Sequence, residues 1–177
     1  MNLQSNDFEL FGLTPRFAQD RAALDARWKD LQREAHPDKF TAQGAAAQRL
    51  AMQWSVRINE AYQRLKDPLK RAAYLCELHD APVNAENNTA MPAQFLMQQM
   101  DWRETLDAAS SVADLDDLDR QVKQSVRDAL LKCEQLLDQR HDYPQAVQQV
   151  RAMMFIERFE RDVQSRLDQM DTKEQGQ

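Results

Sequence analysis

Three histidines and two cysteines are the side chains of this chain best suited to chemistry at neutral pH. His36, His79 and His141 are too far apart for the HxxxH or HExxH spacing that places two zinc ligands on one helix. Cys76 and Cys133 are 57 positions apart, which excludes a CxxC redox pair and an all-cysteine zinc site. Because no glycine-rich phosphate loop is present either, we expect no cofactor and no metal, and two free thiols that pack as small apolar side chains.

The tripeptide His36-Pro37-Asp38 is the strongest candidate site. A proline keeps the preceding residue out of the helical region, so a helix must end here and the backbone is stiff. The sequence therefore predicts an imidazole and a carboxylate projecting from one rigid turn. As an acid–base pair of a helical hydrolase they would need a surrounding pocket, whereas a docking point for another protein needs none, and we favour the docking point.

Two amphipathic helices flank this turn and must position it. The first begins at an N-cap, Asp20, and runs to about residue 35, and the second covers about residues 45–66, with a loop over 40–46 between them. Apolar residues recur in both at spacings of three and four, which predicts an antiparallel hairpin with facing stripes. These stripes are Leu24, Trp28, Leu31 and Ala35 in the first helix, and Leu50, Trp54, Ile58, Ala61 and Leu65 in the second.

The remainder of the chain predicts an all-α fold with two domains. Residues 80–92 hold two prolines and three asparagines, and we interpret them as a linker. They separate an N-terminal domain, residues 1–79, from a three-helix bundle, residues 93–171, and residues 172–177 are expected to be a disordered tail. The bundle helices are predicted at about 93–109, 114–137 and 145–170, and a further short helix at 70–79.

Composition excludes several classes of function. The mean hydropathy of −0.76 and the absence of a long apolar run argue against a membrane protein, and no secretory signal is visible. The net charge is −6, and residues 81–177 carry 11 basic against 18 acidic side chains. Such an acidic half is unsuited to nucleic acid or to an anionic membrane. We expect a cytoplasmic protein, and a monomer.

Three blocks, Asp7–Leu13, His36–Phe40 and Ile58–Pro68, resemble the signature of a J domain in order and spacing. The resemblance implies an antiparallel helical hairpin with flanking short helices, and a co-chaperone that stimulates a DnaK-type chaperone ATPase. Asp30 departs from the many J domains that have a second basic residue there, which suggests a specialised partner. The resemblance assigns the chaperone contact to His36, Pro37, Asp38, Lys29, Arg27, Arg33 and Lys39.

Two further blocks, Arg71–Leu75 and Phe95–Glu104, resemble the HscB family of iron–sulfur co-chaperones. A Gly/Phe-rich segment and a CxxCxGxG repeat, typical of general-purpose J proteins, are absent. An N-terminal cysteine-rich module, found in mitochondrial homologues, is absent too, which indicates a bacterial form. The family resemblance assigns binding of the iron–sulfur scaffold IscU to Leu96, Met97, Met100, Asp101, Glu104 and Phe155.

The resulting hypothesis is a non-enzymatic adaptor in iron–sulfur cluster biogenesis. Its C-terminal bundle would bind IscU, and its His-Pro-Asp loop would stimulate ATP hydrolysis by an HscA-like chaperone. The alternative within the same class is a general J-domain co-chaperone that recruits unfolded clients to a DnaK-type ATPase.

Overall fold

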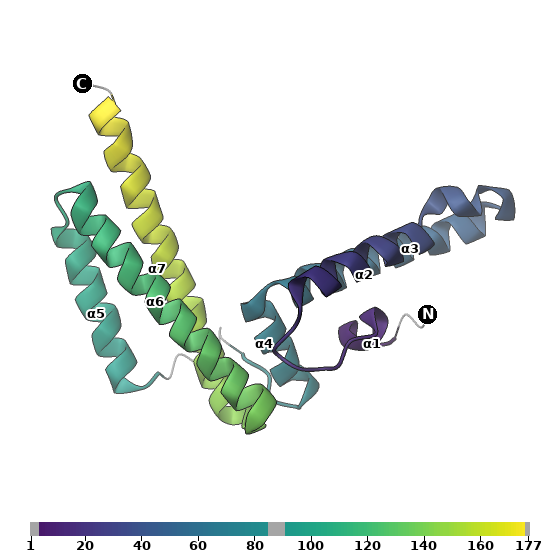
Figure 1. Cartoon of the computed structure of the whole chain (residues 1–177), viewed down its shortest axis with the longest axis horizontal. Helices are drawn as coiled ribbons and strands as arrows, with labels where there is room; N and C mark the ends of the chain where they lie inside the picture. Colours follow the sequence, from purple (N-terminus) through teal and green to yellow (C-terminus); the bar gives the residue numbers. More distant parts are fainter. Residues whose placement is uncertain (1–3, 85–90, 176–177) are drawn as a thin grey trace. The chain divides into compact units, whose positions relative to one another are not determined.

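The computed structural model describes residues 4–84 and 91–175, and within these ranges helices are the only regular secondary structure (Figure 1). The chain divides into two compact units, Met1–Leu75 and Cys76–Gln177. The division falls inside helix α4 (Pro68–Leu78), ahead of the segment 80–92 that we interpreted as a linker. Residues 85–90 of that segment lie outside the described residues.

In the first unit, helices α2 (Arg21–Glu34) and α3 (Ala45–Lys66) lie side by side as the predicted hairpin (Figure 1). Asp20 caps α2, because its side chain accepts hydrogen bonds from the amides of Ala22 and Ala23 at 2.8 and 3.2 Å. The predicted stripes form most of the core between the helices. Their buried members are Leu24, Leu31, Ala35, Ile58, Ala61 and Leu65.

The prediction was wrong at the closed end of the hairpin. Of the predicted loop over residues 40–46, residues 40–43 belong to a short 3-10 helix, η1 (Pro37–Gln43), which packs on α3. There Ala51 takes the inward position, and Leu50, turned by about 100° around the helix, remains 48% exposed instead of joining the core. Gly44, at φ 91°, then connects η1 to α3.

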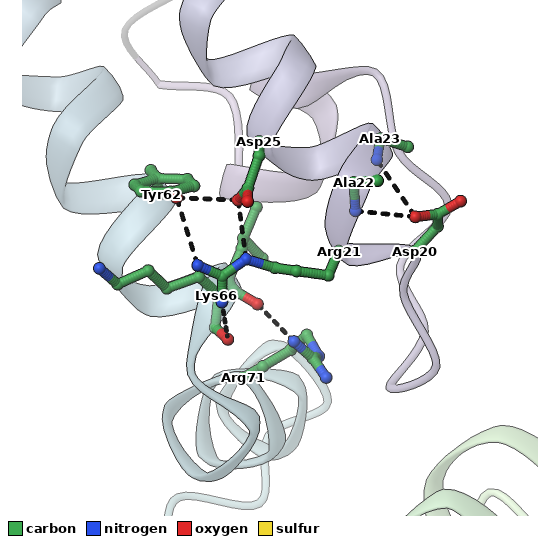
Figure 2. Close-up of polar contacts among 9 residues, drawn as sticks. Asp20, Arg21, Ala22, Ala23, Asp25, Tyr62, Lys66 and Arg71 are labelled. Atoms are coloured by element: carbon green, nitrogen blue, oxygen red, sulfur yellow. Dashed lines mark hydrogen bonds and ion pairs between the residues drawn. The ribbon is translucent and has the colours of Figure 1, made fainter.

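Polar contacts tie α2 to α3 at the open end of the hairpin (Figure 2). The Tyr62 hydroxyl donates to Asp25 Oδ1 at 2.8 Å, and Arg21 Nε donates to the same oxygen at 2.7 Å. The hydrogen bond from Tyr62, followed by that from Arg21, lowers the pKa of Asp25, and the pKa of Tyr62 is raised in return.

Arg71 of α4 closes the base of the first unit. Its buried guanidinium donates to the carbonyl oxygen of Phe17 at 2.7 Å and to that of Leu65 near the end of α3. Figure 2 shows this side chain beside the end of α3. Because the last carbonyls of a helix have no partner within the helix, this arginine satisfies groups that would otherwise be buried without hydrogen bonds.

Helix α1 (Asp7–Phe11) is fixed on α3 by a fully buried carboxylate. Arg64 Nη1 donates to Asp7 Oδ2 at 2.9 Å, and Arg57 Nη2 lies 2.6 Å from Oδ1 as an ion pair without hydrogen-bond geometry. The backbone amide of Asp7 also donates to the Tyr74 hydroxyl at 2.9 Å. The carboxylate of Asp7 thus connects α1 to α3, and its backbone amide connects α1 to α4.

In the second unit, helices α5 (Ala93–Ala108), α6 (Val112–Glu134) and α7 (Tyr143–Gln175) form the predicted three-helix bundle (Figure 1). A short π-helical segment, η2 (Gln135–Gln139), ends α6. Buried apolar side chains from α6 and α7 make the centre of the bundle. They include Leu115, Leu118, Val122, Cys133, Val150, Ile156, Phe159 and Val163.

Two helix ends differ from the sequence predictions. Helix α6 begins before Asp114, because Ser111 is the N-cap: its hydroxyl accepts from the Asp114 amide, and the Asp114 carboxylate accepts from the Ser111 amide in return. Helix α7 continues to Gln175, past the predicted start of a disordered tail at residue 172. Residues 171–175 include no glycine or proline that would end the helix. Residues 176–177 lie outside the described residues.

The start of the predicted linker, together with His79 before it, packs on α7. The ring of His79 stacks on Tyr143 with 4.0 Å between centroids. Val83 is buried, and its carbonyl oxygen accepts a 2.7 Å hydrogen bond from Arg151 Nε. Residues 81–84 have no regular secondary structure, as expected for a linker, and Val83 anchors them on α7.

We predict that Asp7→Asn lowers the free energy of unfolding of the first unit by about 2–4 kcal/mol, because two arginines lose the carboxylate they face. Hydrogen exchange of the α3 amides measures the effect. Glu9→Gln removes a negative charge from the same helix at an exposed position and serves as the control, since the glutamine oxygen can still accept the hydrogen bond from the Asn6 amide. Equal protection in wild type and Asp7→Asn would show that the buried ion pair does not hold α1 on α3.

The two thiols provide a prediction for the second unit. Burial raises the pKa of Cys76 to about 11 and that of Cys133 to about 12. The folded unit therefore keeps protons that the unfolded chain loses above its ordinary thiol pKa, so stability falls as the pH rises above about 9. A disulfide reagent at pH 8 should label neither thiol in the native protein and both in urea. Fast labelling of native protein would contradict the burial of these side chains.

Candidate functional site

The structure places the sequence-predicted site residues on two separate surfaces, one in each unit. The first is the turn at the closed end of the hairpin, which we call the HPD loop (His36, Pro37 and Asp38). The second is a cluster of exposed apolar side chains on the bundle, which we call the apolar face (Leu96, Met97, Met100 and Phe155). Within the described ranges, no group of three or more histidine, cysteine or carboxylate side chains is arranged to hold a metal ion.

The HPD loop is held by its own backbone. His36 is the N-cap of η1, and its Nδ1 accepts a 3.3 Å hydrogen bond from the Asp38 amide. Pro37 occupies the first position of η1, where a missing amide proton costs nothing. The carbonyl oxygen of His36 accepts from the Lys39 amide at 3.0 Å, and that of Asp38 accepts from the Thr41 hydroxyl at 3.1 Å. Hydrogen bonds among neighbouring residues therefore fix the conformation of the loop.

The side chains of His36 and Asp38 both point into solvent. The imidazole of His36 is 58% exposed and the carboxylate of Asp38 is 85% exposed, and 3.6 Å separates His36 Nδ1 from Asp38 Oδ2. Such exposure is unsuited to acid–base catalysis, which depends on a site that excludes water. It is well suited to contact with a second protein.

The basic residues predicted beside the loop differ in whether they form ion pairs within the protein. Arg33 pairs with Asp30 at 2.9 Å, and Arg27 lies 3.7 Å from Glu34. Among the residues that the structure describes, Lys29 and Lys39 form no ion pair. The acid at position 30 thus offsets one of the predicted cations, and Lys29 and Lys39 remain the charges most available to a partner.

The apolar face exists because α5 has apolar residues on more than one side. Trp102 and Leu106 are buried against the bundle, so the residues that point away from them must face water. Leu96, Met97 and Met100 are 50%, 66% and 63% exposed. Apolar side chains that gather in solvent in this way commonly mark a site of protein–protein contact.

Helix α7 contributes Phe155 to the same level of the bundle. Trp102 stacks on Phe159 with 5.5 Å between ring centroids, and Arg103 pairs with Asp162 at 3.1 Å. Residue numbers therefore increase together along α5 and α7, which run parallel (Figure 1). Phe155 precedes Phe159 by one helical turn and lies beside the turn of α5 that precedes Trp102. It is 38% exposed.

The predicted acidic members of this surface, Asp101 and Glu104, are exposed on α5. Asp101 follows Met100 in the chain, and Glu104 lies one turn beyond it, so both share the stripe of Met97 and Met100. The residue pattern alone favoured core for this stripe, and only the resemblance to the HscB family favoured a binding surface. The burial of Trp102 on the adjacent side of α5 provides that distinction.

We predict that Met97→Ala and Met100→Ala each change the free energy of unfolding by no more than about 0.5 kcal/mol, since both side chains are already in water. Trp102→Ala should cost about 3–5 kcal/mol, because it leaves a cavity in the bundle. Urea unfolding, followed by hydrogen exchange in α6 and α7, measures both effects. Large destabilisation by either methionine substitution would mean that the apolar face is part of the core.

Comparison with known proteins extends over nearly the whole chain. Residues 91–164 match the family model described as the HscB C-terminal oligomerisation domain. A co-chaperone protein HscB homolog of Burkholderia multivorans is 44% identical over 175 residues, which cover 97% of this chain and 99% of the relative.

Solved structures agree. Chaperone HscB from Vibrio cholerae is 34% identical with a TM-score of 0.80, and the match covers 93% of this chain and 99% of that one. Human co-chaperone protein HscB is 26% identical with a TM-score of 0.86, with 93% and 83% covered. The predicted all-α fold, an N-terminal J domain followed by a C-terminal helical domain, is therefore confirmed, and the chain belongs to the HscB family of co-chaperones.

Proposed function

We propose that this co-chaperone acts in cytoplasmic iron–sulfur cluster assembly by bringing the scaffold protein IscU to an HscA-like chaperone ATPase. The HPD loop contacts the ATPase and stimulates ATP hydrolysis, and the apolar face binds IscU. The observation that carries the proposal is the exposure of both surfaces, the side chains of His36 and Asp38 in one unit and the apolar face in the other.

The apolar face has the chemistry of an adaptable protein contact. Methionine side chains are flexible and polarisable, and can adjust to the shape of a partner surface. The exposed carboxylates of Asp101 and Glu104 add charge at the edge of the contact, which favours one orientation of the partner. An acidic rim of this kind selects a scaffold with basic side chains around an apolar patch.

The HPD loop supplies the second contact without a nucleotide site of its own. Because the loop is ordered before it binds, little conformational entropy is lost when it docks. Lys29 and Lys39, which form no ion pair among the described residues, direct the loop toward an acidic surface of the ATPase. Joining the two contacts in one chain raises the local concentration of IscU at the ATPase, even when each contact alone is weak.

The test is phosphate release by the HscA-like ATPase in the presence of this protein, of IscU, or of both. We expect the two together to stimulate more than the sum of their separate effects. His36→Gln should return the rate to that without co-chaperone, because it removes the exposed imidazole, while the thermal melting curve remains that of wild type.

A second variant separates the two surfaces. The double substitution Met97→Ser with Met100→Ser should abolish the part of the stimulation that depends on IscU and keep the part that does not. Leu131→Ser, at a position of α6 that is 60% exposed and outside the apolar face, is the matched control.

The remaining outcomes reassign the function. Stimulation that IscU never enhances would favour the general co-chaperone that recruits unfolded clients. No stimulation by the wild-type protein would exclude the HPD loop as an activator of this ATPase.

A further inference from the structure

An apolar groove of about 300 Å³ opens at the closed end of the hairpin, in the same unit as the HPD loop. Its walls come from the end of α2, from η1 and from the first half of α3. Phe40 and Trp54 line it as half-buried side chains, and Leu50 lines it while 48% exposed. It exists because α3 continues beyond the end of α2, so that η1 alone covers the apolar side of these turns.

The groove is continuous in sequence with the HPD loop. Glu34 and Ala35, which immediately precede His36, form part of one wall. Phe40 and Gln43, on the helix that Pro37 and Asp38 begin, form another. A protein that contacts the exposed side chains of the loop therefore has an apolar depression directly beside its contact surface.

The lining indicates what kind of group enters. Small-molecule sites combine apolar walls with several polar groups that converge on the ligand. Among the described lining residues, Glu34 and Gln43 have polar side chains and Trp54 adds one indole N–H, and Glu34 already lies 3.7 Å from Arg27. Lys39, which precedes the lining residue Phe40 in the chain, is exposed and has no ion-pair partner within the described part of the chain. An aliphatic side chain with a neighbouring carboxylate complements this combination.

We infer that the groove receives an aliphatic side chain of the partner chaperone ATPase, next to an acidic residue that faces Lys39. This inference rests on the proposed function, since it names a second point of contact for the same ATPase. The HPD loop then carries the stimulation, whereas the groove contributes affinity and selects among chaperones.

The test separates affinity from maximal stimulation. Leu50→Gln places an amide in the groove at an exposed position, and Met52→Gln makes the same kind of change at a 60% exposed position of α3 that does not line it. Leu50→Gln should raise the concentration for half-maximal ATPase stimulation about tenfold and keep the maximum, as expected for loss of an apolar anchor. Met52→Gln should change that concentration by less than about twofold.

Each result has one meaning. Equal concentrations for wild type and Leu50→Gln, in a protein that does stimulate the ATPase, would overturn the groove contact and leave the proposed function intact. Absence of stimulation by wild type is the separate failure of the proposed function. A melting curve of Leu50→Gln equal to that of wild type verifies that the variant is folded.

A second measurement reports on the groove itself. Fluorine NMR of protein labelled with fluorotryptophan can report on the groove. Trp54 lines it, whereas Trp28 donates a hydrogen bond to Asn59 and Trp102 is buried in the other unit. Addition of the ATP-bound ATPase should shift the fluorine resonance of Trp54 most. A shift of Trp54 that follows the concentration of this protein alone would overturn the inference, because a second copy would then be the occupant.

Discussion

Burial of one apolar stripe between α2 and α3 is the interaction on which the first unit depends. A helix that buries one side is held in both position and rotation, so its end points in a defined direction. Because the stripe reaches Ala35 at the end of α2, the last packed residue stands next to His36. The packing of the core therefore sets the position of the HPD loop, although the side chains of His36 and Asp38 are themselves exposed.

The base of the hairpin shows the opposite use of polar groups. Asp7 and Arg71 are buried, and each joins segments that are distant in sequence. A buried charge is stable only when it is fully paired, so these contacts tolerate little variation in geometry. At the other end, polar groups are paired loosely or only with their own backbone. The same hairpin is thus held by buried polar contacts where it meets α1 and α4, and is exposed at the HPD loop.

Helical periodicity was sufficient to predict the hairpin, the bundle and most of their buried residues, because burial of a stripe leaves a regular trace in the sequence. Periodicity failed to predict burial where a residue is buried only if a neighbouring helix extends far enough to cover it. Leu50 and Ile58 belong to the same stripe, in which apolar residues recur every three or four positions. The residues around Leu50 do not indicate that α2 is too short to cover it. The acidic residues that begin at Asp114 predict a helix start there, whereas the Asp114 carboxylate accepts a hydrogen bond from the amide of the N-cap Ser111. The pairing of Asp30 with Arg33 was visible as a spacing of three, but only the geometry shows that it forms.

The apolar face illustrates how a surface can be recognised as surplus to the fold. A helix that packs on one side needs only one stripe, and α5 satisfies this need with Trp102 and Leu106. The leucine and methionine side chains on its other side are exposed to water in the isolated chain. Each Å² of apolar surface that stays exposed forgoes about 25 cal/mol of stabilisation. The fold gains nothing from them, so their stabilising contribution can be realised only when another molecule covers them. A partner that does so gains affinity without requiring α5 to rearrange, since the side that packs on the bundle is already occupied.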